Sequence, residues 1–225
     1  MPLNKAATVK DKTARIMIVD DHPVLREGLA YRISSQPDMT VCAQAADVGE
    51  ALKKICELNP DMVIVDIALK TSDGLELIKA LKARHGHVRA LVYSMYEEVL
   101  YADRCLRAGA RGYLNKEANP NDVIDAIREI LAGRVYLSPT MTSRVVGRAV
   151  SGATPEADPI DSLTDRQLEV FRLIGQGLTA HEVADRLHIS IHTVETHREN
   201  IKRKLNVTTA SELARHAVLW ATQGS

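Results

Sequence analysis

The sequence contains few aromatic residues, few cysteines and no excess charge of either sign. Aromatic residues make up 4% of the 225 residues, which argues against a surface that stacks the bases of single-stranded nucleic acid. Lysine plus arginine equal aspartate plus glutamate, at 29 each, so the overall charge indicates no polyanionic partner. No apolar run is long enough to cross a bilayer, and no signal peptide is evident. We therefore expect a cytoplasmic protein that makes no contact with a membrane.

The three cysteines, Cys42, Cys56 and Cys105, are an odd number and lack the spacing of metal ligands. Each lies in an apolar stretch. Buried, reduced thiols are therefore expected, as is usual for a cytosolic protein.

Short apolar segments alternate with helical patterns through the first part of the chain. Five strands are expected at residues 15–19, 39–45, 62–65, 89–94 and 112–114, and a helical pattern follows each one. This alternation predicts an α/β fold, a doubly wound five-stranded parallel sheet with right-handed crossovers.

The chain divides into four parts by composition. Residues 1–14 are polar and are expected to form a disordered tail, and residues 15–134 form the α/β domain. Residues 135–159 are rich in turn-forming residues and are predicted to be a linker. Residues 160–225 are predicted to be helical throughout, with a short helix, a turn and a longer helix from Ser190 to Leu205. That arrangement is typical of a helix-turn-helix domain.

Chemically useful side chains follow four of the five predicted strands. They are Asp20 and Asp21, Asp66, Ser94 and Lys116. Parallel strands bring their carboxyl ends to one edge of the sheet, where three carboxylates favour a hard cation such as Mg2+. Asp66 is placed as a carboxylate nucleophile toward phosphorus, and Lys116 as a point charge for a phosphoryl group. Singly, each residue also fits a turn, a helix cap or a solvated surface; together they favour a site.

Residues 15–133 resemble the receiver domain of bacterial two-component response regulators, which has a flavodoxin-like fold. The matching segments are Val19-Asp20-Asp21-His22, Val65-Asp66-Ile67-Ala68-Leu69, Asp73-Gly74, Tyr93-Ser94 and Gly112-Tyr113-Leu114-Asn115-Lys116. The resemblance implies that a sensor histidine kinase phosphorylates Asp66. It implies that Asp21, Asp66 and the carbonyl of Ala68 hold Mg2+, with Asp20 acting through water. It also implies that Ser94 swings toward the phosphoryl group and that Tyr113 moves inward behind it.

Three positions near Asp66 limit this interpretation. Lys70 and Thr71 stand where the family usually has Pro and Gly, which bears on phosphoryl lifetime or kinase choice. Metal-dependent phosphatases with an aspartate nucleophile place an acid two residues later, where this chain has Ala68. We therefore expect a slow switch rather than an enzyme. The alternatives are such a phosphatase and a scaffold that works without phosphorylation.

The longer predicted helix of the second domain has two different faces. Ile191, Val194, Ile201 and Leu205 are expected to pack inward. The opposite face is polar and carries His192, Thr196, Glu199, Asn200 and Arg203. Such a face is usually solvated, but a helix-turn-helix context favours DNA.

Residues 160–223 resemble the LuxR-type helix-turn-helix of the NarL/FixJ response regulators. The matching segments are Leu163-Thr164-Asp165-Arg166-Gln167-Leu168-Glu169-Val170, Gly177, Thr179, Glu182-Val183-Ala184, Leu187, Ile189-Ser190, Thr193-Val194-Glu195-Thr196-His197 and Asn200-Ile201-Lys202-Arg203-Lys204-Leu205. The resemblance implies base contacts at Glu195, Thr196 and Glu199, and phosphate contacts near Thr179, Thr193 and His197. His181, His192, Asn200 and Arg203 complete the expected DNA-facing set. The implied ligand is a double-stranded promoter operator with an inverted repeat.

The second domain departs from the family in its charge. Ala180 and His181 stand where the family usually has Asn and Lys, and Glu195 stands where it often has Lys. From residue 160 onward, eight basic residues balance eight acidic ones. We therefore expect weak non-specific DNA binding. Five of the eight histidines lie in this domain, so DNA affinity should rise on acidification as they become charged.

Together the two resemblances imply a response regulator in which phosphorylation of Asp66 controls DNA binding and transcription. Phosphorylation either frees the recognition helix or promotes a homodimer. The last predicted helix, with Leu213, Val218, Leu219 and Trp220, is a candidate dimer surface. Its simpler role is to close the small helical core.

Overall fold

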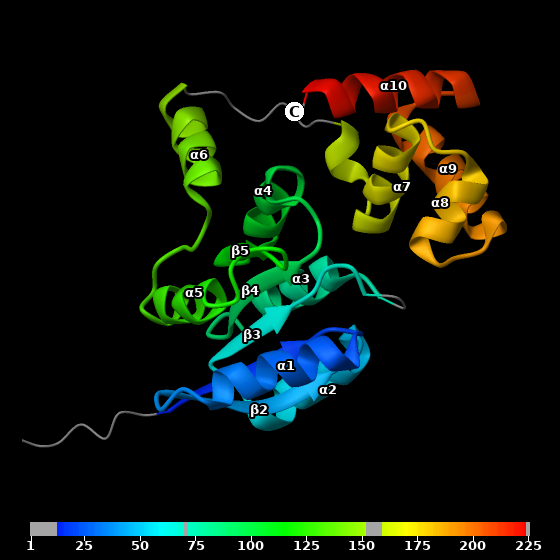
Figure 1. The fold of residues 1–225 in the computed structure, drawn as a ribbon. Helices are drawn as coiled ribbons and strands as arrows, with labels where there is room; N and C mark the ends of the chain where they lie inside the picture. Colours follow the sequence, from blue (N-terminus) through cyan, green and yellow to red (C-terminus); the bar gives the residue numbers. More distant parts are fainter. Residues whose placement is uncertain (1–12, 70–71, 152–158, 224–225) are drawn as a thin grey trace, which may run out of the picture.

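The computed structural model describes residues 13–69, 72–151 and 159–223 (Figure 1). Most of the predicted N-terminal tail, together with Lys70 and Thr71, lies outside the described residues. No helix within the described ranges is both long enough and apolar enough to span a membrane.

The first domain is built on a five-stranded parallel sheet. Its strands are β1 (Ala14–Val19), β2 (Met39–Ala45), β3 (Met62–Val65), β4 (Arg89–Ser94) and β5 (Gly112–Asn115). They lie in the order β2-β1-β3-β4-β5, and every neighbouring pair is parallel. The predicted fold class is confirmed, and β1 and β5 are each one residue longer than predicted.

Five helices cover the two faces of this sheet. They are α1 (Pro23–Ser34), α2 (Val48–Leu58), α3 (Gly74–Arg84), α4 (Glu98–Ala108) and α5 (Asp122–Leu131). Alternate strand residues point to opposite faces: Ile16 and Ile18 pack with α1 and α5, whereas Met17 and Val19 pack with α2, α3 and α4. Both sheet faces are therefore buried, which explains the continuous apolar run in β3.

Local signals in the sequence set most helix ends. Asp47 and Asp73 cap α2 and α3 by accepting backbone hydrogen bonds from Glu50 and Leu75. Gly109 ends α4 with a φ of 124°, a conformation that favours glycine. Helix α5 begins at Asp122, two residues after Pro120.

The predicted linker, residues 135–159, contains a helix that the composition did not indicate. Helix α6 (Pro139–Ser151) contacts α4 and buries Met141 completely. Ser138 precedes it and accepts a hydrogen bond from the Met141 backbone N–H over 3.2 Å, while Pro139 occupies the first helical position. These are ordinary signals of a helix start, which the turn-rich composition of the segment concealed.

The second domain consists of short helices. They are the 3-10 helix η1 (Pro159–Ser162), α7 (Asp165–Gly175), α8 (Ala180–Leu187), α9 (Ile191–Leu205) and α10 (Ala210–Gln223). Thr164 and Thr179 form capping boxes, and Ser190 caps α9 by accepting a hydrogen bond from the Thr193 backbone N–H. His188 adopts a left-handed conformation in the turn between α8 and α9.

Apolar packing continues from the first domain into the second. Leu75 and Tyr101 belong to the same contiguous cluster of buried apolar residues as Leu163 and Phe171. The two domains therefore share one packed region on the α3–α4 side of the sheet (Figure 1).

The expectation that all three cysteines are buried is wrong. All three are free thiols, but only Cys105 is buried; Cys42 is half-buried and Cys56 is exposed. An apolar stretch does not specify which helix face a residue occupies, and Cys56 lies on the outer side of α2.

Candidate functional site

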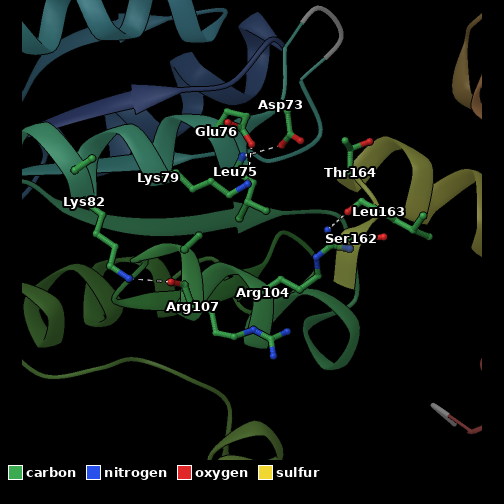
Figure 2. Close-up of a pocket in the computed structure, with 12 residues that line it drawn as sticks. Asp73, Leu75, Glu76, Lys79, Lys82, Arg104, Arg107, Ser162, Leu163 and Thr164 are labelled. Atoms are coloured by element: carbon green, nitrogen blue, oxygen red, sulfur yellow. Dashed lines mark hydrogen bonds and ion pairs between the residues drawn. The ribbon is translucent and has the colours of Figure 1, made fainter. Parts of the chain in front are cut away.

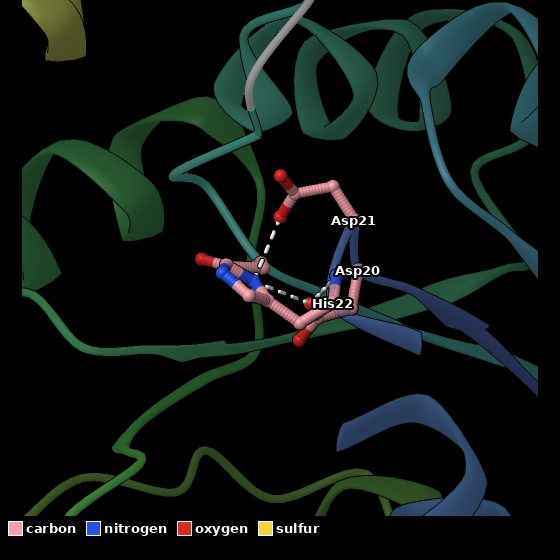
Figure 3. Close-up of side chains that lie close together, drawn as sticks. Asp20, Asp21 and His22 are labelled. Atoms are coloured by element: carbon pink, nitrogen blue, oxygen red, sulfur yellow. Dashed lines mark hydrogen bonds and ion pairs between the residues drawn. The ribbon is translucent and has the colours of Figure 1, made fainter. Parts of the chain in front are cut away.

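The carboxylates predicted at the strand ends lie close together. Ligand atoms of Asp20, Asp21, His22 and Asp66 all fall within 4.8 Å of one another, and Figure 3 shows the first three side chains converging at the end of β1. Asp20 is 5% exposed and Asp66 is 2% exposed. Parallel pairing of β1 with β3 produces this convergence, because it aligns the carboxyl ends of the two strands.

His22 was not singled out from the sequence as a site residue. Its Nδ1 lies 3.3 Å from an Asp20 carboxylate oxygen and 2.9 Å from an Asp21 oxygen. The only signal was its position directly after Asp20-Asp21. A half-exposed imidazole can thus neutralise part of the acidic cluster when it is protonated.

Each Asp66 oxygen has a defined set of donors. Oδ1 accepts hydrogen bonds from Ser94 Oγ over 2.7 Å and from the Ala68 backbone N–H over 2.9 Å. Oδ2 accepts from Lys116 Nζ over 2.5 Å. The carboxylate is therefore held in one orientation by groups from β3, β4 and β5.

Lys116 bridges the two buried carboxylates. Its Nζ lies 2.6 Å from Asp20 Oδ2 and 2.5 Å from Asp66 Oδ2, and its side chain is 2% exposed. Burial acts to lower the pKa of Lys116, but Asp66 and Asp20 outweigh it and raise the pKa above its usual value. Lys116 thus remains charged and offsets part of the negative charge of the cluster.

The donor set fits a hard divalent cation. Asp20, Asp21 and Asp66 supply carboxylate oxygens in one cluster, and Ala68 follows Asp66 closely enough to add a backbone carbonyl. Mg2+ favours such oxygen ligands and keeps several waters, so few protein ligands are needed.

Gly74 allows the loop after β3 to return closely to Asp66. A Cβ atom at this position would lie 2.3 Å from the carbonyl oxygen of Asp66 and 2.7 Å from Cα of Ile67. Real Cβ contacts are never this short, so another residue would force the loop away. The glycine therefore helps to fix the backbone beside Asp66.

The hydroxyl and the aromatic side chain expected to move on phosphorylation already point inward. Ser94 is fully buried against Asp66, and Tyr113 is 1% exposed. Tyr113 Oη donates to the carbonyl of Tyr96 over 2.9 Å. Ser94 is the last residue of β4, and Tyr96 lies two residues later in the loop that joins β4 to α4.

That loop also contacts the second domain. Tyr96 Oη donates a hydrogen bond to Glu169 of α7, and Glu97 pairs with Arg172 of α7 over 2.9 Å. Arg104 of α4 donates to the carbonyl of Leu163. These partners could not be paired from the sequence, because they lie roughly sixty to seventy-five residues apart in the chain.

The predicted DNA-facing residues lie on the surface of the second domain. Thr179, His181, His192, Glu195, Thr196, Glu199 and Arg203 are exposed, whereas Thr193, His197 and Asn200 are half-buried. Because these exposures include the whole described chain, the first domain leaves the outer face of α9 uncovered.

The inward face of α9 differs in one residue from the prediction. Val194 and Ile201 are fully buried and Leu205 is partly buried, but Ile191 is 45% exposed. Ile191 is the first residue of the helix, so it lies at the edge of the packed region rather than within it.

Ion pairs reduce the charge of the outer face of α9. Glu195 pairs with Arg198 over 3.0 Å, and Glu199 pairs with Lys202 over 2.7 Å. Burial, aided by Arg166, lowers the pKa of His197. This face is therefore less basic than its lysines and arginines alone suggest.

Comparisons with known proteins match both parts of the chain. Residues 16–128 match the response regulator receiver domain, and residues 161–217 match the bacterial regulatory proteins of the luxR family. The oxygen regulatory protein NreC of Staphylococcus carnosus is 34% identical over 209 residues, which cover 91% of this chain and 96% of NreC.

Solved structures show the same architecture. A LuxR-family two-component response regulator from Aurantimonas is 38% identical, with a TM-score of 0.57, and covers 62% of this chain and 99% of its own. RcsB from Salmonella enterica, bound to promoter DNA in the presence of a phosphomimetic, has a TM-score of 0.57 at 22% identity. That match covers 92% of this chain and 98% of RcsB, and it supports the fold alone.

Proposed function

The chain belongs to the two-component response regulators that join a receiver domain to a LuxR-type helix-turn-helix and regulate transcription, and from this premise we propose that a sensor histidine kinase phosphorylates Asp66. The observation that carries the proposal is the buried cluster of Asp20, Asp66, Ser94 and Lys116. Phosphorylation in turn controls dimerisation and binding to a double-stranded promoter operator.

The chemistry assigned to Asp66 is attack on phosphorus. One carboxylate oxygen forms a P–O bond while the P–N bond to the imidazole of a phosphohistidine breaks, and the imidazole leaves with a proton from solvent. Lys116 stands against the same carboxylate and can meet the charge of the phosphoryl oxygens. Ser94 Oγ can donate to one of those oxygens, because it already donates to Asp66.

Asp20, Asp21, Asp66 and the carbonyl of Ala68 are the residues that would hold Mg2+. When bound, the cation supplies neutralisation of the charge that gathers on the phosphoryl oxygens. Asp20 also orients Lys116 through their contact of 2.6 Å.

A role as a turnover phosphatase is disfavoured by the surroundings of Asp66. The position two residues after it is Ala68, whose backbone N–H donates to Asp66 but which has no acid to offer. At most, slow autophosphorylation and autodephosphorylation are expected. A phosphorylation-independent scaffold is disfavoured because every group of the phosphoryl site is in place.

The signal is proposed to leave the site through the β4–α4 loop. Ser94 contacts Asp66, and Tyr96, two residues later, contacts Glu169 of α7. Tyr113 donates to the Tyr96 carbonyl and therefore couples β5 to the same loop. A displacement of Ser94 toward a bulkier phosphoryl group would be transmitted directly to the helix-turn-helix domain.

Of the two outputs considered, the arrangement favours dimerisation over release of a covered recognition helix. The outer face of α9 is exposed while the two domains are in contact. Helix α10 buries Leu213 and Ala217 but exposes Val218 (45%) and Leu219 (53%), so it both closes the helical core and presents an apolar surface. A two-fold dimer through this surface would match an inverted-repeat operator.

Intact mass spectrometry after incubation with a small acyl phosphate and Mg2+ tests this proposal. The wild type should gain one phosphoryl group, and Asp66→Asn should gain none. Asp61→Asn is a matched control, because Asp61 lies at the start of β3, away from the site, and this variant should gain the group.

No mass gain in the folded wild type would contradict the proposal and favour the scaffold. Steady release of phosphate from a phosphomonoester would favour the phosphatase.

A further inference from the structure

The contact between the two domains buries a carboxyl group that, among the described residues, has no hydrogen-bond donor and no positive partner within hydrogen-bond distance. We call this region the domain seam; it is formed by Asp73, Arg104, Leu163, Asp165 and their neighbours. It borders a cavity of about 590 Å3 between α3, α4 and the start of α7, and Figure 2 shows the residues that line this cavity, among them Asp73, Arg104 and Leu163.

Asp165 is the first residue of α7 and is 3% exposed. No described residue donates a hydrogen bond to either of its carboxylate oxygens. Arg104 lies 3.6 Å away, too far for a normal hydrogen bond, and it donates instead to the carbonyl of Leu163. An ionised Asp165 would therefore be a buried charge with weak compensation, which is costly.

A second carboxyl group, that of Asp73, acts on Asp165 across the domain seam. Asp73 lines the same cavity as Thr164, the residue before Asp165, and it raises the pKa of Asp165. Asp73 Oδ1 accepts a hydrogen bond from the Leu75 backbone N–H over 2.9 Å. Two carboxylates can be hydrogen-bonded to each other only if one of them carries a proton. A proton shared between Asp165 and Asp73 would therefore relieve both their mutual repulsion and the missing donor at the buried Asp165.

Other charged or titratable groups around Asp165 do not compensate its charge well enough to make this proton unnecessary. Lys79 on α3 and Arg104 on α4 favour the ionised form, and Asp73 opposes it. Tyr101 and Cys105 on α4 face Asp165 as neutral groups whose own pKa values are raised by burial. Glu169, on the same helix as Asp165, is bonded to Tyr96 and Arg166.

We propose that docking of the helix-turn-helix domain onto the receiver takes up one proton, which is held between Asp165 and Asp73. The docked state is then favoured in mildly acidic solution and weakened in alkaline solution. This linkage acts without phosphorylation and is a second input to the same domain contact.

The direction in which docking depends on pH follows from the pKa of Asp165 in the docked and undocked states. In the docked state burial, followed by Asp73, raises the pKa of Asp165 from 3.8 to about 8. In the undocked state Asp165 is exposed to water, and its charge is favourable at the start of a helix. The docked state therefore binds the extra proton between pH 4 and 8, and the docking constant falls roughly tenfold per pH unit over that interval before levelling off.

Small-angle X-ray scattering of the full, unphosphorylated chain between pH 5.5 and 8.5 at constant salt tests the proposal. The radius of gyration of the wild type should increase with pH as the domains separate. Asp165→Asn cannot ionise but can still donate to Asp73, so it should remain docked over the whole range. The matched control is Asp185→Asn on α8, whose exposed carboxylate lies outside the domain seam; it should behave as the wild type does.

A second variant covers the case in which Asp165→Asn does not fold. Asp73→Asn keeps a good helix cap and offers an amide donor to the ionised form of Asp165, so docking should persist to higher pH than in the wild type. The proposal is overturned by a wild-type radius that does not change with pH. It is equally overturned if Asp165→Asn, folded by circular dichroism, is undocked throughout or keeps the wild-type dependence, or if Asp73→Asn does not move the transition.

Discussion

Ser94 Oγ donates to Asp66 Oδ1 over 2.7 Å, so the hydroxyl that ends β4 is bonded directly to the carboxylate that ends β3. Two residues further along the chain, Tyr96 reaches Glu169 of the second domain. The end of β4 and the loop that follows it thus touch both the proposed phosphorylation site and α7 of the DNA-binding domain.

Replacement of Ser94 by alanine should uncouple phosphorylation of Asp66 from the contact between Tyr96 and α7. We expect Ser94→Ala to accept a phosphoryl group by mass spectrometry, because Asp66 and Lys116 remain. Phosphorylation should then lose most of the roughly 5- to 150-fold effect on operator affinity that a coupling of 1–3 kcal/mol provides. Ser35→Ala, which removes an exposed hydroxyl bonded to Arg32, should retain that effect. Full retention in Ser94→Ala would contradict the relay.

Replacement of Lys116 should reveal how strongly the repulsion between Asp20 and Asp66 destabilises the fold. Lys116→Met leaves Asp20 and Asp66 buried without their shared cation, which should lower the free energy of unfolding by about 3–5 kcal/mol in the absence of Mg2+. Mg2+ should raise the melting temperature of this variant more than that of the wild type. Lys54→Met removes the partner of Glu50 in a partly exposed pair and should cost about 1 kcal/mol or less. Equal losses in the two variants, or no added effect of Mg2+, would argue against the proposed cation site.

Enlargement of Gly74 should displace the backbone at Asp66. A Cβ atom would lie 2.3 Å from the Asp66 carbonyl oxygen, so we expect Gly74→Ala to lose about 1–3 kcal/mol of stability and to phosphorylate more slowly. Gly28→Ala in α1 meets nothing within 4 Å and should be neutral or stabilising by up to about 1 kcal/mol. Denaturant unfolding and intact mass measure the two effects. Normal phosphorylation of Gly74→Ala would show that the loop has room to move.

DNA affinity should rise as the pH falls through the titration range of histidine. Protonation of histidines in the second domain adds positive charge next to the DNA phosphates. Because burial and Arg166 lower the pKa of His197, that residue should contribute little to the rise. Fluorescence anisotropy at constant salt from pH 7.5 to 6 measures the rise.

Two variants test whether the change in DNA affinity with pH comes from histidines at the DNA-facing surface. The Asp165→Asn background keeps docking constant, so that only DNA contacts change with pH. Within it, His192→Gln should reduce the rise, whereas His85→Gln in the receiver should not. Affinity that is flat with pH would refute the prediction.

The sequence predicted that the polar side chains at the strand ends meet, because the topology of the sheet brings them together. Once β1, β3, β4 and β5 are parallel neighbours, residues at their carboxyl ends must meet, so Asp20, Asp66, Ser94 and Lys116 could be placed together without coordinates. Helix caps such as Thr164 and Ser190 were also predictable, because a cap acts on a residue two or three positions away.

The domain seam could not be predicted in this way. Tyr96 and Glu169, like Asp73 and Asp165, are distant in the chain, and no periodicity relates their positions. Cys56 and Ile191 were predicted to be buried but are exposed. A pattern of apolar residues indicates which face of a helix packs inward, but it does not give the burial of each residue on that face. Helix α6 was hidden by the turn-forming residues around it.

The apolar cluster that runs from Leu75 and Tyr101 to Leu163 and Phe171 has a consequence for how the chain melts. Side chains that share one packed region lose their contacts together, so a docked chain should absorb heat in a single cooperative transition even though it contains two folds. Separation of the domains divides that region, and the calorimetric trace of an undocked chain should then resolve into two smaller peaks.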